Sequence, residues 1–207
     1  MASRFEFIIF SMTLSFAAIF HMAMAGDPDI LSDFIVPLGS PPVVDGNLFT
    51  FTGMRQLVGA PPPDKFKVLK ASLAEFPILN GQSVSMAVLQ YPGGSVNPPH
   101  THPRASELLF LLDGSLQVGI VDTTNKLYTQ TLQEGDIFVF PKGLVHFQYN
   151  ADANKPAFAV SAFGSANAGT VSIPNAVFNT SISDAVLATS FKTDVSTILK
   201  LKAGLAH

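Results

Sequence analysis

The stretch from residue 93 to residue 114 reads GGSVNPPHTHPRASELLFLLDG, and the stretch from 135 to 150 reads GDIFVFPKGLVHFQYN. Each combines a short run of β-favouring apolar residues with glycine and proline at its ends, which is typical of short strands separated by tight turns. Asp113-Gly114 predicts a hairpin between two strands, and Glu134-Gly135-Asp136 indicates a weaker turn. These two stretches therefore predict the central strands of a β domain.

Similar β-rich runs continue on both sides of these stretches. Together with the runs inside these stretches, eight lie between residue 65 and about residue 163: KFKVLKASL, VSMAVLQY, ELLFLLDG, SLQVGIVD, LYTQTLQEG, DIFVFP, HFQYN and PAFAVSAFG. Runs such as 110–112 and 137–140 are apolar at nearly every position, which predicts strands buried between two sheets. The sequence thus predicts an all-β fold, a closed antiparallel jelly-roll β-barrel.

The chain divides into four predicted segments. Residues 1–25 form a secretory signal peptide, residues 26–63 an extended N-terminal arm rich in Pro, Gly and Asp, and residues 64–165 the barrel core. Residues 166–207 form a C-terminal helical extension, in which Ser183 and Asp194 can cap two short helices. No repeat of fixed period is present, which excludes solenoids and propellers.

The first 25 residues, MASRFEFIIFSMTLSFAAIFHMAMA, have the features of a signal peptide. Arg4 precedes an apolar run of about 14 residues, and Ala23 and Ala25 precede Gly26, which predicts cleavage after Ala25. The run is shorter than the roughly 20 residues that span a bilayer. We therefore expect a secreted chain without a membrane span, in which Asn179-Thr180-Ser181 is an acceptor site for an N-linked glycan.

Composition narrows the class of protein further. The 207 residues are 47% hydrophobic and 13% charged, with a formal net charge of -3. Scattered basic residues and a slight negative charge argue against binding to nucleic acid. The sparsely charged surface indicates subunit contacts. Cysteine is absent, so the chain forms no disulfide, and we expect the N-terminal arm to be held by packing alone.

Three histidines and one glutamate are the candidate metal ligands. His100 and His102 are two residues apart, so on an extended strand both imidazoles project from one face. Glu107 would lie on the opposite face of a straight strand, but Pro103 intervenes and can reset the register through a bend. His146 follows a Pro-Lys-Gly turn and can reach the same point from a neighbouring strand. Together they predict a metal site.

The donor set does not select one metal. Three imidazoles and a carboxylate without a thiolate suit Mn, Fe, Zn or Cu, and affinity alone favours copper or zinc over manganese. Asn97 is a turn residue by its position before two prolines, and its side chain is a candidate to reach the metal cavity. Arg104 is interpreted as a solvated or interface charge.

The two stretches resemble the two motifs of the germin and germin-like family of the cupin superfamily. The patterns are G-x5-H-x-H-x4-E-x6-G from Gly94 to Gly114 and G-x5-P-x-G-x2-H-x3-N from Gly135 to Asn150. The resemblance implies a cupin jelly-roll with C-terminal helices that assembles as a homohexamer, a trimer of dimers. It also implies Mn²⁺ bound by His100, His102, Glu107 and His146, in glycoproteins of the plant apoplast and cell wall.

The resemblance implies two alternative functions. The first is a superoxide dismutase-like enzyme that converts superoxide to hydrogen peroxide and dioxygen, in defence or cell-wall modification. The second is a metal-stabilised hexamer without activity, serving as a binding, structural or storage protein. Oxalate oxidases of the family carry two substrate-binding asparagines. Asn97 matches one of them and Ala87 stands at the other, which argues against oxalate oxidation.

Overall fold

The computed structural model describes residues 26–41 and 43–205. The predicted signal peptide, with its cleavage site after Ala25, lies outside these residues. Within the described ranges, no helix is both long and apolar enough to cross a membrane.

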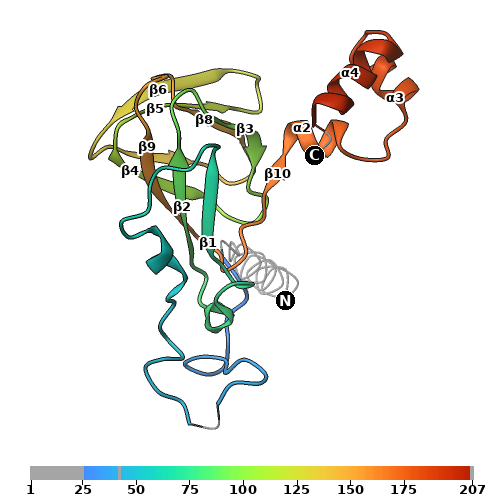
Figure 1. Ribbon diagram of the computed structural model, residues 1–207. Helices are drawn as coiled ribbons and strands as arrows, with labels where there is room; N and C mark the ends of the chain where they lie inside the picture. The colour runs from blue at the N-terminus through green and yellow to red at the C-terminus, as the bar shows by residue number, and fades with distance from the viewer. Residues whose placement is uncertain (1–25, 42, 206–207) are drawn as a thin grey trace, which may run out of the picture.

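Two five-stranded antiparallel sheets form a barrel (Figure 1). The strand order is β1-β2-β9-β4-β7 in the first sheet and β10-β3-β8-β5-β6 in the second. The strands are β1 Lys67–Ala71, β2 Ser85–Tyr91, β3 Val96–Thr101, β4 Glu107–Asp113, β5 Ser115–Val121, β6 Leu127–Gln133, β7 Ile137–Phe140, β8 Val145–Tyr149, β9 Ala157–Phe163 and β10 Val171–Ser172. This architecture confirms the predicted all-β jelly-roll.

The core lies between the two sheets, and strand alternation selects its members. On β4, Leu109 and Leu111 are fully buried against Leu116 and Val118 of β5. The intervening β4 side chains face outward. The prediction that runs 110–112 and 137–140 form strands buried between two sheets therefore holds only for their inward side chains, because each strand has the other sheet on one side only.

The outward side of this sheet is nevertheless apolar. Leu108 on β4 is 49% exposed, and Ile137 on β7 is 62% exposed. The same face carries Phe110, Leu112 and Val139, which are also exposed. We call these five residues the outer apolar face. Contiguous apolar surface of this kind is typical of an interaction site.

The predicted hairpin at Asp113-Gly114 is wrong. Strands β4 and β5 flank this turn but belong to different sheets, so the turn carries the chain across the barrel. Gly114 has φ +84°, and a Cβ atom there would lie 2.6 Å from the carbonyl oxygen of Pro156. Glycine is thus required both by the backbone conformation and by the close approach of the chain after β8.

Gly114→Ala is expected to destabilise the protein more than Gly135→Ala. Both positions have positive φ, which costs alanine roughly 1–2 kcal/mol. A Cβ atom at Gly135 has open space, whereas at Gly114 it meets backbone atoms that cannot move cheaply. Thermal melting of the two variants measures the difference. Equal losses would show that the contact with Pro156 has no energetic role.

Three helices follow the barrel and project beside it (Figure 1). They are α2 Ile173–Phe178, α3 Asp184–Ser190 and α4 Val195–Leu205. The two predicted caps are confirmed, since Ser183 Oγ accepts from the Val186 amide at 3.3 Å and Asp194 Oδ1 from the Thr197 amide at 2.9 Å. Helix α2 was not predicted.

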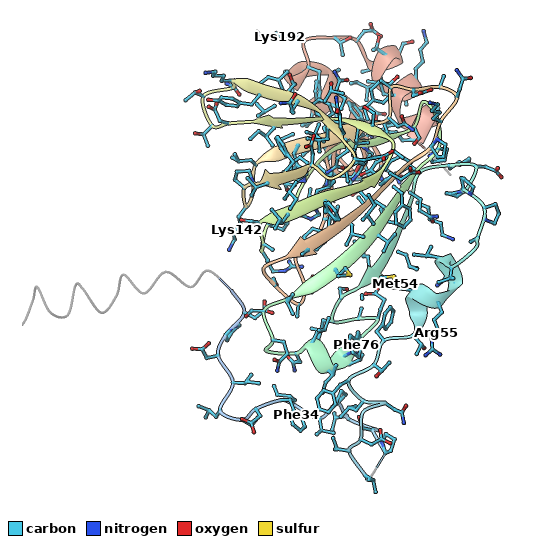
Figure 2. All side chains as sticks on the ribbon, turned by 90° about the vertical axis from the view of Figure 1, so that its left-hand side faces the viewer. Phe34, Met54, Arg55, Phe76, Lys142 and Lys192 are labelled. Carbon is cyan, nitrogen blue, oxygen red and sulfur yellow. The ribbon has the colours of Figure 1, made fainter. Side chains whose placement is uncertain are left out.

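The described part of the N-terminal arm contains one 3-10 turn, η1 Gly53–Leu57. A second, η2 Pro77–Leu79, follows β1. Phe51 packs against Phe76, with ring centroids 5.5 Å apart. Figure 2 labels Phe76 in this part of the molecule. Hydrogen bonds also hold the arm. Asp27 accepts from Ser165 Oγ at 2.5 Å and from the Ala166 amide at 2.7 Å. The expectation that packing alone holds the arm is therefore wrong.

Candidate metal centre

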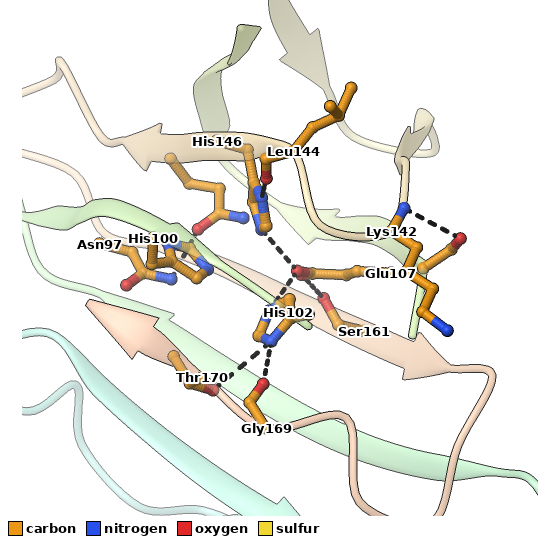
Figure 3. Close-up of polar contacts among 12 residues, drawn as sticks. Asn97, His100, His102, Glu107, Lys142, Leu144, His146, Ser161, Gly169 and Thr170 are labelled. Carbon is orange, nitrogen blue, oxygen red and sulfur yellow. Dashed lines mark hydrogen bonds and ion pairs between the residues drawn. The ribbon is translucent and has the colours of Figure 1, made fainter. Parts of the chain in front are cut away.

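The structure brings the four predicted ligands together in the barrel (Figure 3). His100 lies on β3 directly opposite His146 on β8, and Glu107 is the first residue of β4 in the other sheet. His102 follows β3. One ligand atom from each side chain lies within 4.8 Å of all the others, and none of the four residues is more than 6% exposed.

The segment between His102 and Glu107 explains how side chains five residues apart can face the same point. Strand β3 ends at Thr101, and residues 102–106 are irregular before β4 begins. This segment carries the chain from the second sheet to the first. Glu107 therefore faces the histidines from across the barrel, consistent with the predicted reset near Pro103.

Hydrogen bonds at Nδ1 orient all three imidazoles. His100 Nδ1 lies 2.8 Å from the Pro98 carbonyl, His146 Nδ1 lies 2.8 Å from the Leu144 carbonyl, and His102 Nδ1 lies 2.5 Å from the Gly169 carbonyl. Because a carbonyl oxygen only accepts, we assign the ring proton to Nδ1 in each case. In a neutral ring with this tautomer, Nε2 is the atom that has a lone pair available for a metal.

Glu107 completes the cluster. Its Oε2 lies 3.0 Å from His102 Nε2 and 3.3 Å from His146 Nε2, and its Oε1 accepts from Ser161 Oγ at 2.6 Å. Burial raises the pKa of the Glu107 carboxyl, but the contacts with the two imidazoles and Ser161 outweigh it and lower the pKa to about 2. Burial, and then the neighbouring His146, lowers the pKa of His100 to about 4. At pH 7 the cluster therefore contains a carboxylate and a neutral His100.

This donor chemistry fits a metal cation. The contacts of Glu107 Oε2 with the two Nε2 atoms are favourable while each Nε2 carries a proton. A deprotonated Nε2 and a carboxylate oxygen both present lone pairs, so a cation must take the place of that proton when the rings become ligands. One cation bound by all four side chains would supply the positive charge. The site could therefore hold a first-row metal ion, and its three nitrogens and one oxygen select no single metal.

A cavity of about 380 Å³ opens onto the cluster. Asn97 lies in its wall and donates from Nδ2 to Gln148 Oε1 at 2.7 Å. Ala87, buried on β2, also lines the cavity, so both positions that the resemblance assigns to substrate face the same space. The remaining lining residues are Val68, Lys70, Ser72, Ser85, Met86, Leu89, Phe163, Asn167, Ala168, Gly169 and Thr170.

Several residues around the site were not predicted from the sequence. Ser161 is the one polar residue on the inward side of β9, where its neighbours Ala157 and Ala159 are apolar, and that exception was a usable signal. Arg104 is exposed, as expected for a solvated or interface charge, but its contacts were not predicted: its Nε donates to the Asn167 carbonyl at 2.6 Å and its Nη2 to Asn167 Oδ1 at 2.8 Å. No sequence pattern marked Gly169.

The predicted glycan acceptor lies away from the cluster. Asn179 is exposed at the C-terminal end of α2, where its amide donates to the Asn175 carbonyl at 3.0 Å. The position is accessible in the single chain.

Comparisons with known proteins show the family to which this chain belongs. The cupin family model matches residues 62–198. Germin-like protein 9-3 of Oryza sativa subsp. japonica is 63% identical over 190 residues, covering 89% of this chain and 88% of the relative. Germin-like protein 9-1 from the same plant is 51% identical over 189 residues, covering 89% of this chain and 76% of the relative.

A solved structure extends the comparison to three dimensions. An oxalate oxidase in complex with the substrate analogue glycolate superposes with a TM-score of 0.76 at 32% sequence identity. The match covers 87% of this chain and 98% of that chain. With a family model over most of its length and plant relatives more than half identical to it, this chain belongs to the germin-like proteins of the cupin superfamily.

Proposed function

We propose that this germin-like protein binds Mn²⁺ through His100, His102, Glu107 and His146 and acts as a superoxide dismutase-like enzyme. The observation that supports this is the buried cluster of four ligand atoms, with the Nδ1 atoms of its imidazoles engaged by carbonyls. Manganese, when bound, supplies one-electron exchange between its divalent and trivalent states. The net reaction turns two superoxide anions and two protons into hydrogen peroxide and dioxygen.

The protein's residues have separate roles in this proposal. Glu107 places one negative charge beside a divalent ion, which leaves the site with a net positive charge that attracts a small anion. Lys70 in the cavity wall adds to this potential. The apolar wall formed by Leu89 and Phe163 limits the water around the site. Superoxide is small enough to use the cavity without a dedicated binding residue.

Oxalate oxidation is disfavoured by the cavity wall. Asn97 is present, but the second position is Ala87, whose methyl group cannot hydrogen-bond to a carboxylate. A site that recognises a polar substrate through such hydrogen bonds loses its preference for that substrate once one bonding partner is missing. The same substitution favours the alternative proposal, a metal-stabilised binding, structural or storage protein without turnover.

We further propose a secreted homohexamer, a trimer of dimers, in the apoplast and cell wall. The outer apolar face supports burial of this surface against another chain. Cleavage after Ala25 and a glycan on Asn179 belong to the same proposal, which the exposure of Asn179 supports. The native mass of the secreted protein, with and without glycosidase treatment, tests assembly and glycan together.

The function is tested on the purified secreted protein by elemental analysis and by superoxide dismutase and oxalate oxidase assays, each before and after chelation. We expect about one manganese per chain and superoxide activity that is lost on chelation and in His102→Ala. Oxalate oxidase activity is expected to be absent. Stoichiometric manganese without superoxide activity would overturn the enzyme proposal and support the alternative.

A further inference from the structure

The segment from Gly164 to Thr170 joins β9 to β10 and contacts the metal centre at His102 Nδ1, where the Thr170 hydroxyl lies at 3.5 Å and the Gly169 carbonyl lies closer (Figure 3). Its Gly169 carbonyl accepts the Nδ1 proton of His102. The carbonyls that orient His100 and His146 belong to Pro98 and Leu144, each two residues before its own histidine. The partner of His102 is instead 67 residues away in sequence. The orientation of His102 therefore depends on where residues 164–170 are held.

Asp27 holds the first half of this segment. Its two carboxylate oxygens accept from Ser165 Oγ and from the Ala166 amide, and both Ser165 and Ala166 are almost fully buried. The carbonyls of these residues are used elsewhere, by Ser85 Oγ and by the Leu73 amide. Without the Asp27 carboxylate, a buried hydroxyl and a buried amide lose their acceptor, and the segment must shift to satisfy them.

Arg104 holds the second half. Its guanidinium donates twice to Asn167, and its backbone amide donates to the Ala168 carbonyl at 3.1 Å. Gly169 has φ +69°, and a Cβ atom there would lie 2.6 Å from Arg104 Nη2. The guanidinium therefore packs directly against the residue whose carbonyl orients His102.

We propose that Asp27 and Arg104 are positioning residues for His102. Together they fix residues 165–169 so that the Gly169 carbonyl keeps the proton of His102 on Nδ1 and directs Nε2 toward Glu107. The proposal rests on the metal binding proposed above, but it does not require superoxide activity. In this proposal the Asp27 carboxylate also anchors the N-terminal arm, which no disulfide can do because the chain has no cysteine.

The test measures how fast bound Mn²⁺ dissociates into excess chelator, and records the electron paramagnetic resonance spectrum of the bound ion. Groups that orient a ligating histidine typically change metal affinity about 10- to 100-fold. We therefore expect Asp27→Ala and Arg104→Met to release Mn²⁺ at least about tenfold faster and to change the spectrum. Arg104→Lys keeps the positive charge but cannot make both hydrogen bonds to Asn167, so we expect its Mn²⁺ dissociation rate to lie between those of the wild type and Arg104→Met.

Matched controls separate positioning from loss of charge or of folding. Asp29→Asn alters an exposed carboxylate on the same arm, and Arg55→Met removes an exposed guanidinium of η1; both are expected to release Mn²⁺ at the wild-type rate. If Asp27→Ala does not fold, Asp27→Asn and Ser165→Ala weaken the same contact more gently. A lower melting temperature with unchanged dissociation rate and spectrum would overturn the proposal, because it would leave Asp27 and Arg104 a structural role only.

The proposed function and this inference fail in different ways. Wild-type protein that binds Mn²⁺ without dismutating superoxide overturns the enzyme proposal, while the dissociation rates still decide the role of Asp27 and Arg104. Wild-type protein that binds none of Mn²⁺, Co²⁺ and Zn²⁺ overturns both.

Discussion

His146→Ala is expected to lower metal affinity roughly a hundred- to a thousandfold. Structural zinc sites with four ligands are worth about 10–16 kcal/mol, and on that scale one ligand contributes about 2.5–4 kcal/mol. At about 1.4 kcal/mol per factor of ten, this gives the expected loss. His146 is 1% exposed and no other described side chain is placed to replace it in the cluster. Elemental analysis after dialysis measures the effect.

Two further variants control for packing at this position. The His146 ring stacks on Phe140 with centroids 4.5 Å apart, so truncation to alanine also leaves a cavity. His146→Gln keeps most of the volume and removes the imidazole, and we expect it to lose metal as well. Phe140→Leu loosens the stacking but keeps all four ligands, and it should lower the melting temperature while retaining metal. Unchanged metal content in His146→Ala would remove His146 from the ligand set.

Chelation of the wild-type protein is expected to lower its melting temperature by roughly 5–16 °C. An ion present at 100 to 1,000 times its dissociation constant stabilises the fold by about 2.7–4.1 kcal/mol. In a domain of this size, 1 kcal/mol shifts the melting temperature by about 2–4 °C. Differential scanning calorimetry with and without chelator measures the shift, and added Mn²⁺ should restore it. An identical shift in His146→Ala would mean that the chelator acts elsewhere.

The metal-free protein is expected to lose further stability in mild acid. The pKa of His100 is about 4 in the fold, against 6.5 as its ordinary value. Between these two values the unfolded chain binds more protons than the folded chain, so stability falls as the pH falls from about 6.5 toward 4. Thermal melting of the chelated protein at pH 7 and pH 5 tests this, and we expect the lower melting temperature at pH 5.

The sequence was informative wherever a local period determines structure. The two-residue spacing of His100 and His102 indicated a shared site. Along β4 no such period was visible, because inward Leu109 and outward Leu108 are both leucine. Local patterns failed where distant chain segments decide. Asp113-Gly114 looks like a hairpin, but the pairing partners of β4 are β7 and β9, which lie far along the chain.

Strand β3 and helix α2 were not predicted from the sequence, and each contains proline. Strand β3 contains Pro98 and Pro99, which lack amide protons, and they fit because the β3–β8 register shifts between Asn97 and His100. Helix α2 is one short element with a proline in its first turn. The contacts of Asp27 and Gly169 come from irregular segments. Such segments have no periodic sequence pattern from which their contacts could be predicted.

The central place of β9 in its sheet sets the order of events during synthesis. Strand β9 pairs with both β2 and β4, yet it is made long after both. Ser85 opens β2 and its partner Ser165 follows β9, 80 residues later. At roughly 5–20 residues per second, those 80 residues take about 4–16 s to translate. For that time the β1–β2 hairpin exposes an unpaired edge, and β4 does so from its own synthesis onward. The nascent chain therefore depends on protection from aggregation until its penultimate strand emerges.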